Sequence, residues 1–88
     1  MATPEGLELT LAGRLPAAEA GRVSAVLQAA VAGGCRRITL KLEGLDYVSS
    51  AGIAAFTAAA AALSASGGTL TLVDAQPAVQ VALDLAGW

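Results

Sequence analysis

The residues best suited to chemistry in this chain of 88 residues lie in one short stretch, from Asp46 to Ile53. Two adjacent hydroxyl groups, those of Ser49 and Ser50, stand there just before an alanine-rich segment. A serine at the start of a helix can accept a hydrogen bond from a main-chain amide two or three residues later. A phosphate on Ser50 would lie beside free amides at the positive end of the helix dipole. Capping and phosphorylation are therefore the two roles open to this pair.

The composition gives little support to catalysis. Histidine is absent and Cys35 is the only cysteine, so the chain has no Ser-His or Cys-His pair and no intramolecular disulfide. Asp46 is the one candidate base near the serines, and its spacing from Glu43 does not favour catalysis over solvated surface charge. The same holds for Asp74 and Asp84. We therefore expect a protein that is not an enzyme and that binds no cofactor and no metal.

One residue of the stretch lowers helix stability. Gly52 falls in the first turn after the serines, and glycine costs a helix about 1 kcal/mol relative to alanine. Because glycine has no side chain, it would let the backbone of a partner approach the helix closely. We interpret Gly52 as part of a contact surface.

Charge and hydropathy argue against two classes of partner. The formal net charge is −2 and aromatic residues make up 3%, so the chain lacks the basic surface and stacking platforms of nucleic-acid-binding proteins. Its longest apolar run, residues 51–63, is too short and too rich in alanine to span a membrane. Residues 1–6 lack the basic-then-apolar order of a signal peptide. We expect a cytoplasmic protein that neither binds nucleic acid nor inserts into a membrane.

Alternating apolar residues predict the strands that position the serines. Leucines at every second position over residues 7–12, and apolar residues at every second position over residues 38–43, predict two half-buried strands. Gly13 is expected to open a turn after the first strand. Residues 44–49 are expected to form a short connection after the second. A third strand is predicted over residues 69–73.

Three helices are predicted between and after these strands, over about residues 16–32, 50–65 and 77–86. Pro16 suits the first turn of the first helix, and glycine pairs follow the first two helices. Strands that alternate with helices favour parallel pairing. We therefore predict an α/β fold in which a small sheet of mostly parallel strands carries helices mainly on one face. The length permits one core, hence a single domain over residues 1–88.

Four segments, residues 11–15, 47–53, 67–73 and 76–87, stand in an order that resembles that of STAS domains, a family that includes bacterial anti-sigma factor antagonists. Residues 47–53, Tyr-Val-Ser-Ser-Ala-Gly-Ile, resemble the family's motif at a helix start. Residues 67–73 resemble its Gly-Gly and following strand, residues 76–87 its next helix, and residues 11–15 its strand-ending Gly-X-Leu. The resemblance covers about residues 7–87 and implies the STAS fold.

The resemblance also implies a protein-interaction switch. In antagonists of this family, the serine at the position of Ser50 is phosphorylated by an anti-sigma factor that is a serine kinase. The unmodified antagonist binds that kinase and releases the sigma factor, and phosphorylation breaks the complex. By this resemblance, Ser50 is the phosphorylation site. The implied partner-binding residues are Ser49, Ser50, Ala51, Gly52 and Ile53.

Two positions depart from the family pattern and leave an alternative open. Ser49 stands where an acidic residue is expected, and so does Pro16. Residues 51–54 also resemble a second branch, the small STAS subunit that binds the ATPase of bacterial phospholipid-transport ABC systems, whose members can stop where this chain stops. The alternative is therefore a constitutive transporter subunit that binds its ATPase without a phosphate switch.

Self-association as a homodimer is also open, and Trp88 is expected to pack back on the sheet.

Overall fold

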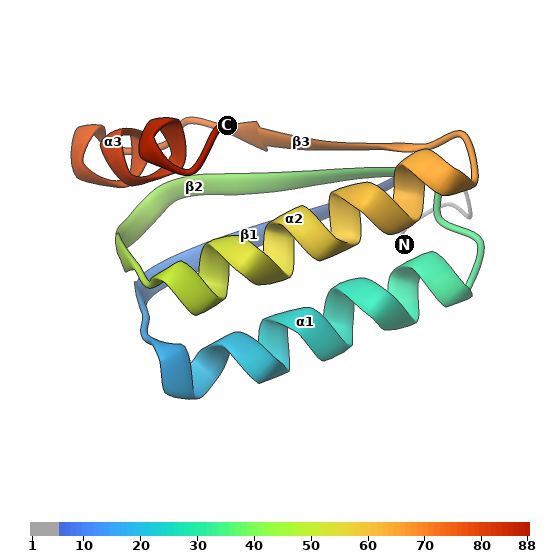
Figure 1. Ribbon diagram of the computed structural model, residues 1–88, viewed down its shortest axis with the longest axis horizontal. Helices are drawn as coiled ribbons and strands as arrows, with labels where there is room; N and C mark the ends of the chain where they lie inside the picture. Colours follow the sequence, from blue (N-terminus) through green and yellow to red (C-terminus); the bar gives the residue numbers. More distant parts are fainter. Residues whose placement is uncertain (1–5) are drawn as a thin grey trace.

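The computed structural model describes residues 6–88 and shows strands and helices in strict alternation (Figure 1). The elements are β1 (Gly6–Leu15), α1 (Ala17–Ala32), β2 (Arg37–Val48), α2 (Ser50–Ala65), β3 (Thr69–Val73) and α3 (Pro77–Leu85). The predictions of α2 and β3 are confirmed, and those of α1 and α3 are confirmed to within one residue. Residues 1–5, on which the signal-peptide observation mainly falls, lie outside the described residues.

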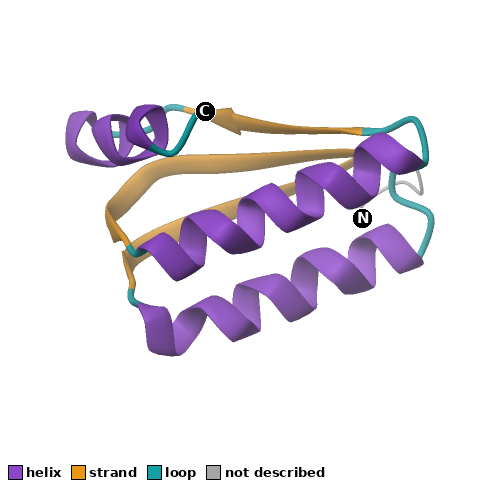
Figure 2. Ribbon diagram, in the orientation of Figure 1, coloured by secondary structure: helices purple, strands orange, loops and turns teal. Residues whose placement is uncertain are grey.

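The sheet has the order β1-β2-β3, and both neighbouring pairs are parallel. The helices α1 and α2 lie side by side across one face, while α3 lies beyond the end of β3 and beside the far part of β2 (Figure 2). The predicted α/β class, with parallel strands and helices mainly on one face, is confirmed. Within residues 6–88 the other face is polar, and an ion pair joins Lys41 to Glu8 across it at 3.3 Å.

Strand β2 continues to Val48, so the prediction of a connection over residues 44–49 is wrong. The register of β2 against β1 shifts at two places, and at each place β2 contributes one residue more than β1. Buried positions alternate up to Leu42 and then stand three residues apart, at Leu45 and Val48. The apolar alternation that marks a strand breaks at each bulge, which is why the sequence pattern suggested that the strand had ended.

Strand β1 likewise runs through Gly13 to Leu15, where a turn was predicted. Gly13 has a φ of +80°, a left-handed conformation that glycine adopts without steric cost, and it lies at the second register shift. The glycine therefore redirects the strand without ending it. As a result, Leu15 pairs with Val48 at the end of the sheet, and both side chains are buried there.

The core fills the space between the sheet and the two helices that cover it. Phe56 of α2 is its largest fully buried side chain, and aliphatic residues make up the rest. Val26 of α1 is apolar but does not enter this core, since it is 51% exposed. Within the described residues, no helix is long and apolar enough to cross a membrane.

Helix α3 is attached to the rest of the fold at both ends. Before its first turn, the Gln76 side-chain amide donates a hydrogen bond to the Glu43 carbonyl oxygen at 2.7 Å. After its last turn, Trp88 Nε1 donates to Thr57 Oγ1 of α2 at 3.2 Å. Trp88 therefore does pack back on the fold, and its hydrogen bond is to α2. Two side chains of α3 enter the core, Val79 and Leu83.

Candidate functional site

The start of α2 lies at the edge of the sheet where the strands end (Figure 1). In open parallel sheets, ligands and partners dock at this edge. Only Ser49 separates the end of β2 from the first residue of α2. The Ser49 N–H donates to the Leu15 carbonyl oxygen at 2.9 Å, which ties the helix start to the end of β1. The predicted stretch is thus held by both strands.

Ser49 is the residue that caps α2. Its backbone is extended, with φ −81° and ψ 165°, and its Oγ accepts a hydrogen bond from the Gly52 N–H at 3.1 Å. Its carbonyl oxygen accepts from the Ile53 N–H at 3.0 Å. The side chain is buried. Of the two serines that could have capped the helix, the structure assigns this role to Ser49.

Ser50 is left exposed as the first residue of α2. In the described part of the chain its hydroxyl makes no hydrogen bond, and the main-chain N–H groups of Ser50 and Ala51 have no acceptor. Free N–H groups at a helix start favour a bound anion. A phosphate on this hydroxyl would therefore lie where the helix tolerates negative charge. Ala51 is exposed beside it.

Gly52 is buried, and its missing side chain serves a contact inside the protein. A methyl group in its place would lie 2.9 Å from both Leu15 Cδ2 and Val48 Cγ2, closer than carbon atoms pack. The glycine lets the first turn of α2 approach the ends of β1 and β2. The expectation that it admits a partner's backbone does not hold. Among the predicted partner-binding residues, two are exposed, Ser50 and Ala51, and three are buried, Ser49, Gly52 and Ile53.

A groove opens beside Ser50, between α2 and the last turns of α3. Its volume is about 370 Å³, and it is lined by Val48, Ser50, Ile53, Ala82, Leu85 and Ala86. Leu85 is 85% exposed, and Val81 on the same helix is 57% exposed. Sequence reasoning missed this groove. The signal was present, because α3 carries more apolar side chains than its core face, Val79 and Leu83, can bury.

A cation–π contact lies at the same edge of the sheet. The Arg14 guanidinium carbon is 4.6 Å from the centre of the Tyr47 ring, and the two residues are register partners on β1 and β2. Both side chains are exposed. The contact joins residues far apart in the sequence, so only the strand register could show it.

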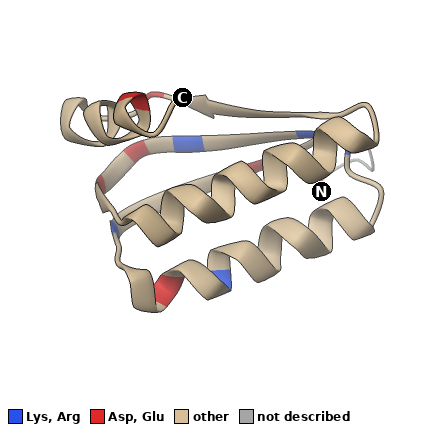
Figure 3. Ribbon diagram, in the orientation of Figure 1, with Lys and Arg blue, Asp and Glu red and all other residues tan. Residues whose placement is uncertain are grey.

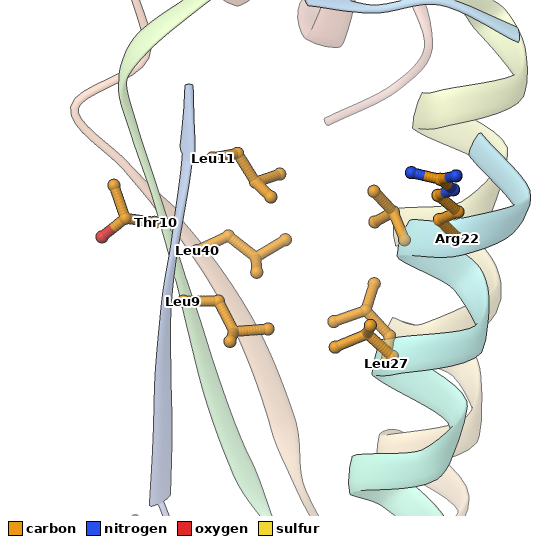
Figure 4. Close-up of a pocket in the computed structure, with 8 residues that line it drawn as sticks. Leu9, Thr10, Leu11, Arg22, Leu27 and Leu40 are labelled. Carbon is orange, nitrogen blue, oxygen red and sulfur yellow. The ribbon is translucent and has the colours of Figure 1, made fainter. Parts of the chain in front are cut away.

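A second cavity, of about 170 Å³, lies between β1 and α1 (Figure 4). Leu9, Leu11 and Leu40 point into it from the sheet toward Leu27 of α1, while Arg22 lies at its border. It contains none of the predicted site residues. Over residues 6–88, no group of three or more His, Cys, Asp or Glu side chains could hold a metal ion.

Comparison with known proteins gives one family. The family model described as "Mlab, STAS domain" matches residues 1–88. BtrV of Bordetella bronchiseptica, named for a proposed role as an anti-sigma factor antagonist, is 36% identical over 78 residues, which cover 89% of this chain and 67% of BtrV.

Two solved structures share the fold. The anti-sigma factor antagonist SpoIIAA in its unphosphorylated form has a TM-score of 0.91 and 24% identity, over 99% of this chain and 76% of that one. The Bacillus cell fate determinant SpoIIAA in its phosphorylated form has a TM-score of 0.82 and 23% identity, over 99% of this chain and 79% of that one.

Proposed function

The chain belongs to the STAS domain family, and on that basis we propose that it is a non-enzymatic anti-sigma factor antagonist. In this proposal it binds an anti-sigma factor that is a serine kinase and is released when Ser50 is phosphorylated. The observation that carries the proposal is the first turn of α2, where Ser49 caps the helix and the exposed Ser50 hydroxyl has no hydrogen-bond partner among residues 6–88. The similarity to BtrV supports the same function.

The geometry explains how a phosphate would switch binding without unfolding the helix. A phosphate adds nearly two negative charges at neutral pH. At Ser50 those charges would lie beside the free N–H groups of Ser50 and Ala51, so α2 would remain folded. The same charges would be forced into the contact surface with the partner, where they would lose their hydration. The complex would therefore dissociate.

The buried residues of the stretch act as supports in this proposal. Ser49 and Gly52 set the height of the first turn of α2 above the strand ends, through the cap and through close packing. Ser49 is also uncharged where the family often has an acidic residue. A phosphate on Ser50 therefore meets no like charge at the preceding residue, which favours its accommodation.

Phosphorylation by the anti-sigma kinase encoded in the same genome tests the proposal. The purified chain is incubated with that kinase and ATP, and its intact mass is measured. We expect one added phosphate on the wild type and none on Ser50→Ala. Ser64→Ala, which changes another exposed serine of α2, should be modified like the wild type. An unmodified wild type, or a modified Ser50→Ala, would refute the proposal.

Residues 51–54, Ala-Gly-Ile-Ala, support a second candidate function, because they resemble the transporter branch of the family. In that case the chain would be a constitutive subunit bound to the ATPase of a phospholipid-transport ABC system. Isothermal titration of the purified ATPase separates the two functions. Tight binding that Ser50→Asp leaves unchanged would favour the transporter subunit, whereas the antagonist proposal requires Ser50→Asp to weaken binding to the kinase.

Two further properties belong to the antagonist proposal. The protein would act in the cytoplasm, because both ATP and the sigma factor are present there. A homodimer stays a prediction from the sequence. Light scattering after size-exclusion chromatography, at loading concentrations about tenfold apart, would detect such self-association as a rise in mass with concentration.

A further inference from the structure

The two exposed residues at the start of α2, Ser50 and Ala51, are too few for a specific protein interface, which usually involves about 20 or more residues a side. We propose that the groove between α2 and α3 extends this surface and receives one aliphatic side chain of the anti-sigma factor, flanked by basic residues. The inference rests on the proposed function and names the chemistry that the partner must present.

The shape and lining of the groove fit an aliphatic side chain. Ser50 is the one polar residue among those that line it, and Val48 and Ile53 lie in it beside the core. Leu85 lines the same groove and is 85% exposed. Single exposed apolar residues are common on protein surfaces. One that borders an apolar groove next to the proposed contact residues would bury much apolar area when a partner fills the groove.

Hydrogen bonds hold the groove open before any partner binds. Trp88 Nε1 donates to Thr57 Oγ1 at 3.2 Å, and the Thr57 hydroxyl donates to the Ile53 carbonyl oxygen at 3.0 Å. This relay ties the chain after α3 to the first turns of α2. A preformed groove loses little conformational entropy on binding, which favours affinity.

The charges on the part of the chain that forms the groove indicate which residues of the partner flank the inserted side chain. From residue 42 to the end, the sequence contains four carboxylates, those of Glu43, Asp46, Asp74 and Asp84, and no Lys or Arg. The cation of Arg14 on β1 reaches the same edge of the sheet and is engaged with the Tyr47 ring. Figure 3 shows acidic positions on α3 and on the adjacent part of β2. Asp84 directly precedes Leu85. Charge complementarity therefore favours a basic partner surface.

The same charge argues against a second copy of this chain as the occupant. In a two-fold dimer the same patch lies on both subunits, so the carboxylates of one copy would face those of the other. Such like-charge contacts are unfavourable. The anti-sigma factor is thus the occupant to which the inference commits.

Binding kinetics separate the contribution of the groove from that of the charges outside it. A phosphate on Ser50 would occupy the wall of the groove, so Ser50→Asp should mainly speed dissociation from the kinase. Asp84 lies outside the groove lining, so Asp84→Asn should mainly slow association and reduce its dependence on salt. A basic residue at the rim does not offset the effect of a charge placed in the groove wall, because that charge would have to lose its hydration inside the contact.

Surface plasmon resonance with the purified kinase that modifies Ser50 provides the test. We expect Leu85→Ala to raise Kd by about tenfold or more, through faster dissociation. We expect Asp84→Asn to slow association by about two- to fivefold at low salt. Val26→Ala is the matched control, since Val26 is an exposed aliphatic residue on α1, at 51% exposure, and lines the cavity between β1 and α1. It should leave Kd unchanged. Circular dichroism confirms that each variant is folded.

The outcomes distinguish failure of this inference from failure of the proposed function. If the wild type is phosphorylated and bound while Leu85→Ala binds as tightly as the wild type, the groove is not used and the antagonist function stands. If Val26→Ala weakens binding as much as Leu85→Ala, docking is not confined to the groove and the inference fails. If the kinase neither binds nor modifies the wild type, both fail.

Discussion

Adjacent serines differ in role because the backbone changes conformation between them. Ser49 is the last extended residue, and there its Oγ reaches the Gly52 N–H. Ser50 has helical geometry, and its hydroxyl stays exposed. A side chain that caps a helix is committed to the fold. The hydroxyl open to modification is therefore the one that the fold does not use.

Replacing each serine in turn should separate these roles by stability. Ser49→Ala should lower the free energy of unfolding by about 1 kcal/mol, since a capping hydrogen bond is lost. Ser50→Ala, at an exposed position with no hydrogen bond from its hydroxyl in the described part of the chain, should change it by less than about 0.5 kcal/mol. Urea unfolding monitored by circular dichroism measures both. Equal losses in the two variants would contradict the assignment of the cap.

Gly52→Ala should destabilise the protein although alanine is the better helix former. The added methyl group would press on Leu15 and Val48, and overpacking a core costs about 1–3 kcal/mol, against about 1 kcal/mol gained in helix propensity. Gly21→Ala is the control, because no described atom that could clash lies within 4 Å of the added methyl group on α1. It should stabilise. A stabilising Gly52→Ala in urea unfolding would show that the close packing does not limit this position.

Among the elements, β2 has the largest influence on the site. Strand β3 pairs only with its first part, residues 37–41, and α3 packs beside the part that follows. The two bulges between β2 and β1 bend that part and bring Leu45 and Val48 into the core. The groove beside Ser50 exists because a short β3 leaves room for α3 at this end of the sheet.

The attachment of α3 by Trp88 can be tested by hydrogen exchange. Trp88→Phe keeps the aromatic ring but removes the hydrogen bond to Thr57 Oγ1, which is worth about 1 kcal/mol. Amide exchange in the last turn of α3 should become about fivefold faster. Amides of Ile38 and Leu40 in β2, which lie far from this bond in the sheet, should keep their rates. A uniform change over all elements would indicate global destabilisation.

For the molecule as a whole, stability comes from the core between the sheet and the helices. Phe56→Ala should lower the free energy of unfolding by about 3–5 kcal/mol, because Phe56 is fully buried. Small domains have only about 5–15 kcal/mol in total, so this variant should be close to unfolding. Leu85→Ala, at a position 85% exposed, should change stability by less than about 0.5 kcal/mol. Thermal unfolding compares the two variants, and similar melting temperatures would contradict the assigned core.

The sequence by itself determined the order of the elements, the α/β class, the family and the bounds of the helices. The elements, the class and the helix bounds follow from local signals: the period of apolar residues, Pro16 at the start of a helix, and glycine after a helix. The family follows from the resemblance of four short segments, residues 47–53 first among them, to STAS domains. The sequence also located the serine pair at the start of a helix. Such signals involve residues within a few positions of one another, so no tertiary contact is needed to interpret them.

Only the tertiary structure decided how far β1 and β2 extend, which serine caps α2, why residue 52 is glycine, and where the groove lies. The bulges depend on register between two strands, and the packing of Gly52 depends on Leu15, which is distant in the sequence. The groove depends on where α3 docks, which Trp88 and Thr57 help to set. Each of these features is an interaction between segments far apart in the chain, and local periodicity carries no information about such distances.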